Sequence, residues 1–377
     1  MRVTNSMLVN NLMRNLNNNF DKVDKLQNKM ASGRKFAHIS DDPIALIYSQ
    51  AARNKLARLG HYQTTVGSAK DWLSQAENGI MELQKIMADA YEECVNATDD
   101  GKTDGDKQNI AQVVGQLRDH FVDTLNAAFG DKYVYAAYNT PGDPAFGFGD
   151  EGIKSFTVVN GALHFNGFDL SQFDGMPADF LNVDLSGLDD SAALAAINGL
   201  GATLPSGLTD QMVLDLHKLR ADVLTFDVGP GISMPVTMNG IDLVLLTNIN
   251  ENGDVVVRNA FNVLQDLYVG TFGDPKATPP TPPLSAGELT KLIQPLQDAQ
   301  NHLLTRTAEI GGRARRLELL ESRYEQDAIN YERMMSDAED VDMAEVIMRL
   351  RMAESVMQAA MSAGARLIQP TLMDFLR

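Results

Sequence analysis

Hydrophobic residues in the first and last thirds of the chain recur at the alternating three- and four-residue spacing that is typical of packed helices. The clearest stripe runs without a break for five heptads. Its members are Leu59, Tyr62, Val66, Ala69, Leu73, Ala76, Ile80, Leu83, Met87, Ala90 and Cys94. This repeat predicts a long helix that packs against others as in a coiled coil.

A shorter stripe of the same kind precedes it and predicts a first helix. Its apolar members are Val9, Leu12, Leu16, Val23, Leu26 and Met30. Ser32-Gly33 predicts the end of this helix, because glycine is common directly after a helix C-terminus. Ser40-Asp41-Asp42-Pro43 predicts the start of the next helix, since it combines a capping residue with proline in the first turn.

The C-terminal third contains two different helical patterns. One has an apolar or aromatic residue at every seventh position, namely Leu296, Leu303, Ile310, Leu317, Tyr324 and Tyr331. The other, between Val341 and Ile368, is apolar on more than one face. It contains Met343, Val346, Ile347, Met348, Leu350, Met352, Val356, Met357 and Met361. Such a helix must be buried, either against another subunit or in the core of its own chain.

The middle of the chain, residues 140–257, has a different composition. Asn160-Gly161 lies between two short β-forming runs, which predicts a hairpin with a type I′ turn. A second hairpin is expected around Gly229-Pro230-Gly231, and short helices are expected over 190–197 and 209–219. These elements predict an inserted α+β domain.

These patterns together predict a mainly α fold. The N- and C-terminal segments are expected to form a long antiparallel helical bundle or coiled coil, and the α+β domain with its β-hairpins is inserted between them. We expect residues 1–45 and 335–377 to form terminal helices, 46–139 and 258–334 a helical rod, and 140–257 an acidic outer domain. A proline-rich stretch, 275–283, is predicted to be an extended connector within the second half of the rod.

Charge and cysteine content exclude several classes of protein. The net charge is −18, which argues against a general nucleic-acid-binding protein. Residues 140–257 carry 16 acidic and 3 basic side chains and therefore supply −13 of that charge. The single cysteine, Cys94, excludes an internal disulfide and a cysteine-based metal site. No apolar run is long enough to cross a membrane, and no cleavable signal peptide is visible at the N-terminus.

No sequence motif supports catalysis or cofactor binding. The six histidines are scattered, and the glycine motifs that bind nucleotides are absent. Asp99–Asp106 is acidic but lacks the order of a calcium loop, so we expect a solvated turn. Arg313–Arg316 lies among glutamates, which favours an ion-paired helix face over a nucleic-acid site. We expect Cys94 to be a small buried residue rather than a reactive thiol. Neither catalytic residues nor a cofactor nor a metal is expected.

Several short motifs, in order along both ends of the chain, resemble those of flagellar hook–filament junction proteins in the flagellin superfamily. They are Arg2–Met7, Lys25–Gln27, Met30–Lys35, Ser40–Pro43, Asp340–Val346 and Gln369–Arg377. The opening Arg-Val-Thr-Asn favours a junction protein over flagellin itself, and the insert carries none of the resemblance.

The resemblance implies that the terminal segments order on assembly as a two-helix coiled coil lining the inner tube of the flagellum. The matching segments are Met7–Met30 and Val341–Ile368. The expected assembly residues on the first are Met7, Val9, Leu12, Leu16, Val23, Leu26 and Met30. On the second they are Met343, Ile347, Leu350, Met357, Met361 and Ile368. The residues expected to pack the rod are Leu59, Val66, Leu73, Ile80, Leu83, Met87, Leu303, Ile310, Leu317 and Tyr324.

The resemblance also implies a structural adaptor without enzymatic activity, exported by the flagellar type III route into the extracellular flagellum. The implied partners are copies of the chain in a ring, a neighbouring hook-associated protein, flagellin and an export chaperone, with no nucleic acid and no insertion into a membrane. The alternatives are flagellin, a cytoplasmic coiled-coil scaffold or signalling protein, and an enzyme whose site lies in the insert.

Overall fold

A computed structural model describes residues 5–373 of the chain, except 37, 39, 100, 131, 137–153, 186, 202–203, 206, 250–252 and 274–281. The chain forms two compact units. Unit 1 consists of Met1–His61 and Ser322–Arg377, and unit 2 consists of Tyr62–Glu321.

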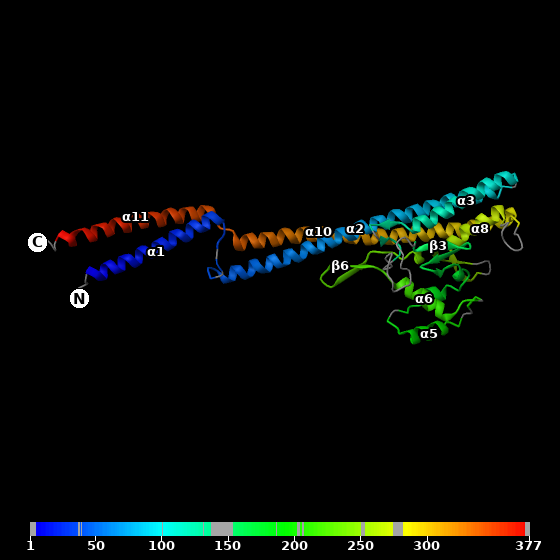
Figure 1. Ribbon diagram of the computed structural model, residues 1–377, viewed down its shortest axis with the longest axis horizontal. Coiled ribbons are helices and arrows are strands. Elements are labelled where there is room, and N and C mark those ends of the chain that lie inside the picture. The colour runs from blue at the N-terminus through cyan, green and yellow to red at the C-terminus, as the bar shows by residue number, and fades with distance from the viewer. Residues whose placement is uncertain are drawn as a thin grey trace. The chain divides into compact units, whose positions relative to one another are not determined.

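Long helices account for most of the structure. They are α1 (Asn5–Ser32), α2 (Pro43–Ala97), α3 (Asp104–Leu125), α10 (Ile293–Glu339) and α11 (Met343–Met373). In unit 1, α1 and α11 lie side by side (Figure 1). Helices α2 and α10 each contribute residues to both units. The prediction of a mainly α fold built on long N- and C-terminal helices is confirmed.

The helix ends follow the local signals in the sequence. Helix α1 ends at Ser32 and is followed by Gly33, whose φ of +69° suits a residue without a side chain. Helix α2 begins at Pro43, and Asp42 accepts a hydrogen bond from the Ala45 amide (3.0 Å). The acidic turn after α2 ends in a capping box, in which Thr103 and Asp106 each bind the other's backbone amide.

The strands and short helices lie between α3 and α10. The strands are β1 (Ala128–Phe129), β2 (Lys132–Tyr133), β3 (Phe156–Val159), β4 (Ala162–Phe165), β5 (Phe168–Asp169), β6 (Thr225–Gly229), β7 (Ile232–Pro235), β8 (Leu245–Ile249) and β9 (Val255–Asn259). The helices are η2 (Ser171–Phe173), α4 (Asp179–Asn182), α5 (Asp190–Asn198), α6 (Asp210–Ala221), α7 (Ile241–Val244), α8 (Ala260–Phe272) and α9 (Ala286–Thr290). Strands β3-β4-β5 form one antiparallel sheet, and β1-β2, β6-β7 and β8-β9 form separate hairpins.

Asparagine and glycine turns determine where the hairpins bend. Asn160 and Gly161 have φ values of +53° and +83°, as the predicted type I′ turn between β3 and β4 requires. Asn166-Gly167 repeats this geometry between β4 and β5, which the sequence reading had not identified. The hairpin of β6 and β7 and the helices α5 and α6 lie where they were predicted, so the inserted α+β region is confirmed.

The core of unit 2 forms along α2 and α10. From Val66 to Cys94, every member of the heptad stripe is buried. The chain's one tryptophan, Trp72, lies beside this stripe. Its ring is edge-on to the ring of Phe129, and the two ring centroids are 5.7 Å apart. Helix α3 packs closely on α8, where the Tyr268 ring lies against Gly115. Of the predicted connector 275–283, most lies outside the described residues.

Candidate assembly interface

The pairing of α1 and α11 buries a narrow apolar strip. Val23 on α1 and Val346 and Leu350 on α11 are buried. Near the other end of the pair, a Cβ added to Gly364 would lie 2.9 Å from Leu12, so the two helices approach closely there. The two helices therefore meet both at these buried side chains and near Gly364.

The predicted N-terminal assembly residues differ widely in exposure. Val23 is buried, and Leu12, Leu16 and Leu26 are half-buried. Met7 and Met30 remain exposed. The side chain of Val9 lies outside the described residues.

The predicted C-terminal assembly residues are also only partly covered. Leu350 is buried and Met357 half-buried, whereas Met343, Ile347 and Met361 are exposed. The side chain of Ile368 lies outside the described residues. Each helix of the pair thus keeps predicted assembly residues that the other helix does not cover.

A second apolar strip on α11 lies outside the buried contact with α1. Met348, Met352 and Val356 recur every four residues and are 61%, 65% and 50% exposed. They lie opposite Leu350 by helical geometry. Exposed apolar strips of this kind mark surfaces that bind another protein.

A groove of about 680 Å³ lies between α1, α11 and the connector that follows α1. Its lining has two acidic side chains, Asp24 and Asp41, against five basic ones, Lys22, Lys25, Lys29, Arg34 and Arg349. Met352 and Val356 line its α11 side. The groove is thus basic, in a chain whose net charge is −18.

The two connectors of unit 1 are joined to each other. Arg34 and Asp340 form an antiparallel bridge. The Lys35 amide donates to the Glu339 carbonyl (2.6 Å), and the Val341 amide donates to the Gly33 carbonyl (3.0 Å). The segment leaving α1 and the segment entering α11 are therefore held in a fixed register.

We call the place where the two connectors pair the crossing of unit 1. Glu339, at the end of α10, is the charged residue at its centre. Its carboxylate is 7% exposed and accepts two hydrogen bonds from the Arg53 guanidinium, at 2.8 and 2.6 Å. It also accepts a hydrogen bond from the Ser49 hydroxyl, and Arg34 lies 3.8 Å away. The hydrogen bonds from Arg53 hold the pKa of Glu339 below its usual value, so the carboxylate stays charged.

The acidic motif that follows has a local structural role. Asp342 accepts hydrogen bonds from the amides of Ala344 (2.9 Å) and Glu345 (3.3 Å) and so caps α11. Asp340 accepts a hydrogen bond from the Ser336 hydroxyl (2.5 Å). This motif therefore sets where α10 ends and α11 begins.

The residues predicted to pack the rod are all buried. In unit 2 these are Val66, Leu73, Ile80, Leu83, Met87, Leu303, Ile310 and Leu317, and in unit 1 they are Leu59 and Tyr324. Cys94 is also buried, with its Sγ 3.5 Å from the Leu289 carbonyl oxygen. Burial raises the pKa of the Cys94 thiol to about 11, which disfavours the reactive thiolate.

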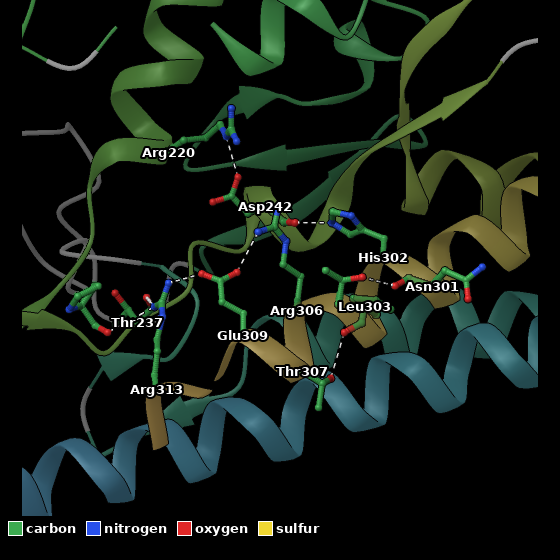
Figure 2. Close-up of polar contacts among 12 residues, drawn as sticks. Arg220, Thr237, Asp242, Asn301, His302, Leu303, Arg306, Thr307, Glu309 and Arg313 are labelled. Carbon is green, nitrogen blue, oxygen red and sulfur yellow. Dashed lines mark hydrogen bonds and ion pairs between the residues drawn. The ribbon is translucent and has the colours of Figure 1, made fainter. Parts of the chain in front are cut away.

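A polar network fastens α10 to the insert within unit 2 (Figure 2). His302 Nε2 donates to the Asp242 carbonyl oxygen (2.7 Å), and the Asp242 carboxylate accepts from Arg220 Nε (2.7 Å). Burial lowers the pKa of His302 and favours the neutral ring, which can make this hydrogen bond. These hydrogen bonds attach the insert to α10 at His302.

Arg313 makes a second polar contact between α10 and the insert. One of its nitrogens bonds Glu309 (2.5 Å), and another donates to the carbonyl oxygens of Thr237 (3.2 Å) and Pro235 (3.4 Å). The predicted ion pairing of this basic run is therefore present at Arg313, but the contact with β7 was not foreseen.

The sequence reading missed the residues that hold the crossing and the network together. Arg53, Glu339 and His302 each contact residues far away in the sequence, so no spacing rule could have identified them. Within the described part of the chain, no three histidine, cysteine, aspartate or glutamate side chains are grouped to hold a metal ion. No helix among these residues is long and apolar enough to cross a membrane.

Residues 3–140 match the family described as the bacterial flagellin N-terminal helical region. Flagellar hook-associated protein 3 of Escherichia coli K12 is 23% identical over 367 residues, which cover 96% of each chain. The chain is similar to hook-associated protein 3 along almost its whole length.

Two further relatives show how much of the chain each likeness covers. Hook-associated protein 3 of Salmonella typhimurium is 22% identical over 96% of this chain, whereas flagellin of Clostridium tyrobutyricum aligns with only 32% of it. The resemblance to hook–filament junction proteins seen in the motifs is thereby confirmed, and it is broader than the resemblance to flagellin.

Solved structures show the same fold. A putative flagellar hook-associated protein of Vibrio parahaemolyticus superposes with a TM-score of 0.54 at 15% identity, covering 80% of this chain and all of that one. FlgL of Xanthomonas campestris superposes with a TM-score of 0.50 at 13% identity, covering 76% of this chain and 99% of that one.

Proposed function

We propose that this chain is a structural subunit of the bacterial flagellum that joins the hook to the filament. The observation that carries this proposal is the likeness to hook-associated protein 3 over 96% of both chains. The exposed apolar residues of α1 and the exposed apolar strip of α11 support it, because a subunit that assembles through these helices needs apolar surface beyond one helix pair.

In this proposal the parts of the chain have separate roles. Residues 1–45 and 335–377 assemble with copies of the chain, 46–139 and 258–334 form the rod, and 140–257 faces outward. The predicted assembly residues on α1 and α11 form the contacts between copies. The acidic insert keeps the outer surface hydrated and repels other assemblies.

The proposed partners follow from this role. They are copies of the same chain in a ring, a neighbouring hook-associated protein, flagellin, and a chaperone during type III export. In this proposal the chain acts outside the cell and catalyses no reaction. The likeness to flagellin over 32% of the chain keeps flagellin as the second candidate.

Two measurements test this function. Electron microscopy with a gold-labelled chain should find it at the distal end of the hook, with few copies per filament. Thousands of copies along the filament would instead identify flagellin, and a chain confined to the cytoplasm would overturn the proposal.

The assembly surface is tested with Met348→Ser and Met352→Ser. Both side chains are exposed, so folding should be unchanged within about 0.5 kcal/mol while assembly onto hooks is lost. The matched control is Met81→Ser, a similarly exposed residue in unit 2. Normal assembly of the double variant would show that this strip is not used.

A further inference from the structure

Three lysines of α1 line one side of the groove in unit 1, beside Asp24 of the same helix. Lys22, Lys25 and Lys29 lie at i, i+3 and i+7 on α1 and so share one face. They form no ion pair with any described side chain. Half-buried Leu26 lies on the same turn, and exposed Met352 and Val356 line the other side of the groove. This surface suits a helix that presents acidic residues around an apolar one.

A helix face of that kind occurs on α10 of the same chain. Glu325, Ile329 and Glu332 lie at i, i+4 and i+7, and all three are exposed. Ile329 is 56% exposed, and neither glutamate is ion-paired with a described residue. Seven residues of helix span about 10 Å, so the outer charges of the two faces have the same separation.

We propose that the face formed by Lys22, Lys25 and Lys29 binds the face formed by Glu325, Ile329 and Glu332 on a second copy of this chain. The inference rests on the proposed function and names one contact by which copies assemble. Among the described residues, no ion pair joins the two faces within one chain.

The geometry of this contact has a direct consequence for assembly. The two faces are different surfaces, so each copy binds one neighbour through its lysines and another through its glutamates. Such head-to-tail contacts close into rings or continue as helical arrays. The charge pairs set the orientation and register of the two helices, and Ile329 contributes apolar contact between them.

Charge reversal tests whether the lysines of one copy pair with the glutamates of another. Lys25→Glu with Lys29→Glu, or Glu325→Lys with Glu332→Lys, should each weaken association of the purified full chain at low salt about tenfold. The variant that carries all four changes should regain association, because the charges are complementary again. Equal association in all variants, or no recovery in the fourfold variant, would overturn the docking proposal.

Disulfide trapping tests whether the two faces lie against each other in neighbouring copies. In a Cys94→Ala background, a chain with Lys25→Cys and a chain of different length with Ile329→Cys are mixed and oxidised. The matched control replaces Ile329→Cys with Asn330→Cys, which lies about 100° further around the helix. We expect about tenfold more cross-linked heterodimer with Ile329→Cys, and equal yields or none would overturn the proposal.

The two proposals fail separately. If the labelled wild-type chain lies at the end of the hook and the cross-link does not form, the function stands and the docking contact is wrong. If the wild-type chain is absent from the flagellum, the function itself is wrong.

Discussion

Arg53 binds both oxygens of the Glu339 carboxylate, at 2.8 and 2.6 Å, and so ties the first turns of α2 to the last turn of α10. The two residues are 286 positions apart in the sequence. Around them, backbone hydrogen bonds join the connector after α1 to the connector before α11. The crossing of unit 1 therefore depends on one charged pair with a buried carboxylate.

Replacing Glu339 should loosen this crossing. Glu339→Gln removes the charge that Arg53 binds, and since the Arg53 side chain is 43% exposed we expect a loss of only about 1 kcal/mol. The amides of Lys35 and Val341 should then exchange hydrogen about fivefold faster. Arg58→Gln, at an exposed position of the same helix, is the control. Unchanged exchange in the Glu339 variant would contradict a role in holding the connectors.

Glu339 should also make the stability of the crossing depend on pH. Because the pKa of Glu339 is lowered by Arg53, its stabilising effect is complete above the ordinary carboxyl value of 4.5. The effect is lost as the pH falls through the lowered value of the folded protein. Protection of the Lys35 and Val341 amides should therefore fall in acid in the wild type, and less so in Glu339→Gln.

Two glycines of α2 should respond to alanine in opposite directions. A Cβ at Gly79 would overlap the hydroxyl of buried Tyr135, which donates to the Ala76 carbonyl (2.7 Å). Gly79→Ala should therefore lower the free energy of unfolding by about 1–3 kcal/mol. At Gly67 nothing lies within 4 Å, so Gly67→Ala should raise it by up to about 1 kcal/mol through helix propensity. Urea unfolding measured by circular dichroism compares the two, and equal shifts would contradict the close packing at Tyr135.

Cys94 should be unreactive in the folded chain. Its side chain is buried, and its pKa is raised to about 11 by that burial. A thiol reagent such as Ellman's reagent should label it only after denaturation. A cysteine introduced at exposed Met348 in a Cys94→Ala background gives the rate for an accessible thiol. Labelling of native Cys94 at that rate would show that the α2 stripe opens readily.

His302 should make unit 2 less stable in mild acid. Burial lowers its pKa, so the folded state binds fewer protons than the unfolded state. Its contribution is therefore complete above the ordinary value of 6.5 and declines as the pH falls below it. In His302→Gln the amide nitrogen can still donate to Asp242, and the decline between pH 7.5 and 5 should shrink. An unchanged decline in His302→Gln would contradict this role of the buried histidine.

Periodic and local features were predictable from the sequence. The heptads of α2 place one residue per turn on the same face, so burial of the stripe from Val66 to Cys94 follows from spacing alone. The hairpin at Asn160-Gly161 follows from local backbone preference.

Single long-range polar contacts were not predictable in the same way. The partners of Glu339 and His302 come from elements distant in the chain, which spacing along one helix does not identify. Among the assembly residues, the spacing indicated an apolar face but not how much of it one partner helix would cover. That fraction depends on the angle and distance between α1 and α11, which a linear pattern does not contain.

The position of Trp72 has a consequence for spectroscopy. The indole is buried in unit 2 beside Phe129, and the chain has no other tryptophan. Intrinsic fluorescence excited at the indole band therefore reports on the surroundings of that one ring. A change confined to α1 and α11 would leave the emission spectrum unaltered. A second indole at Phe20, 47% exposed on α1, would give the terminal helices an optical signal of their own.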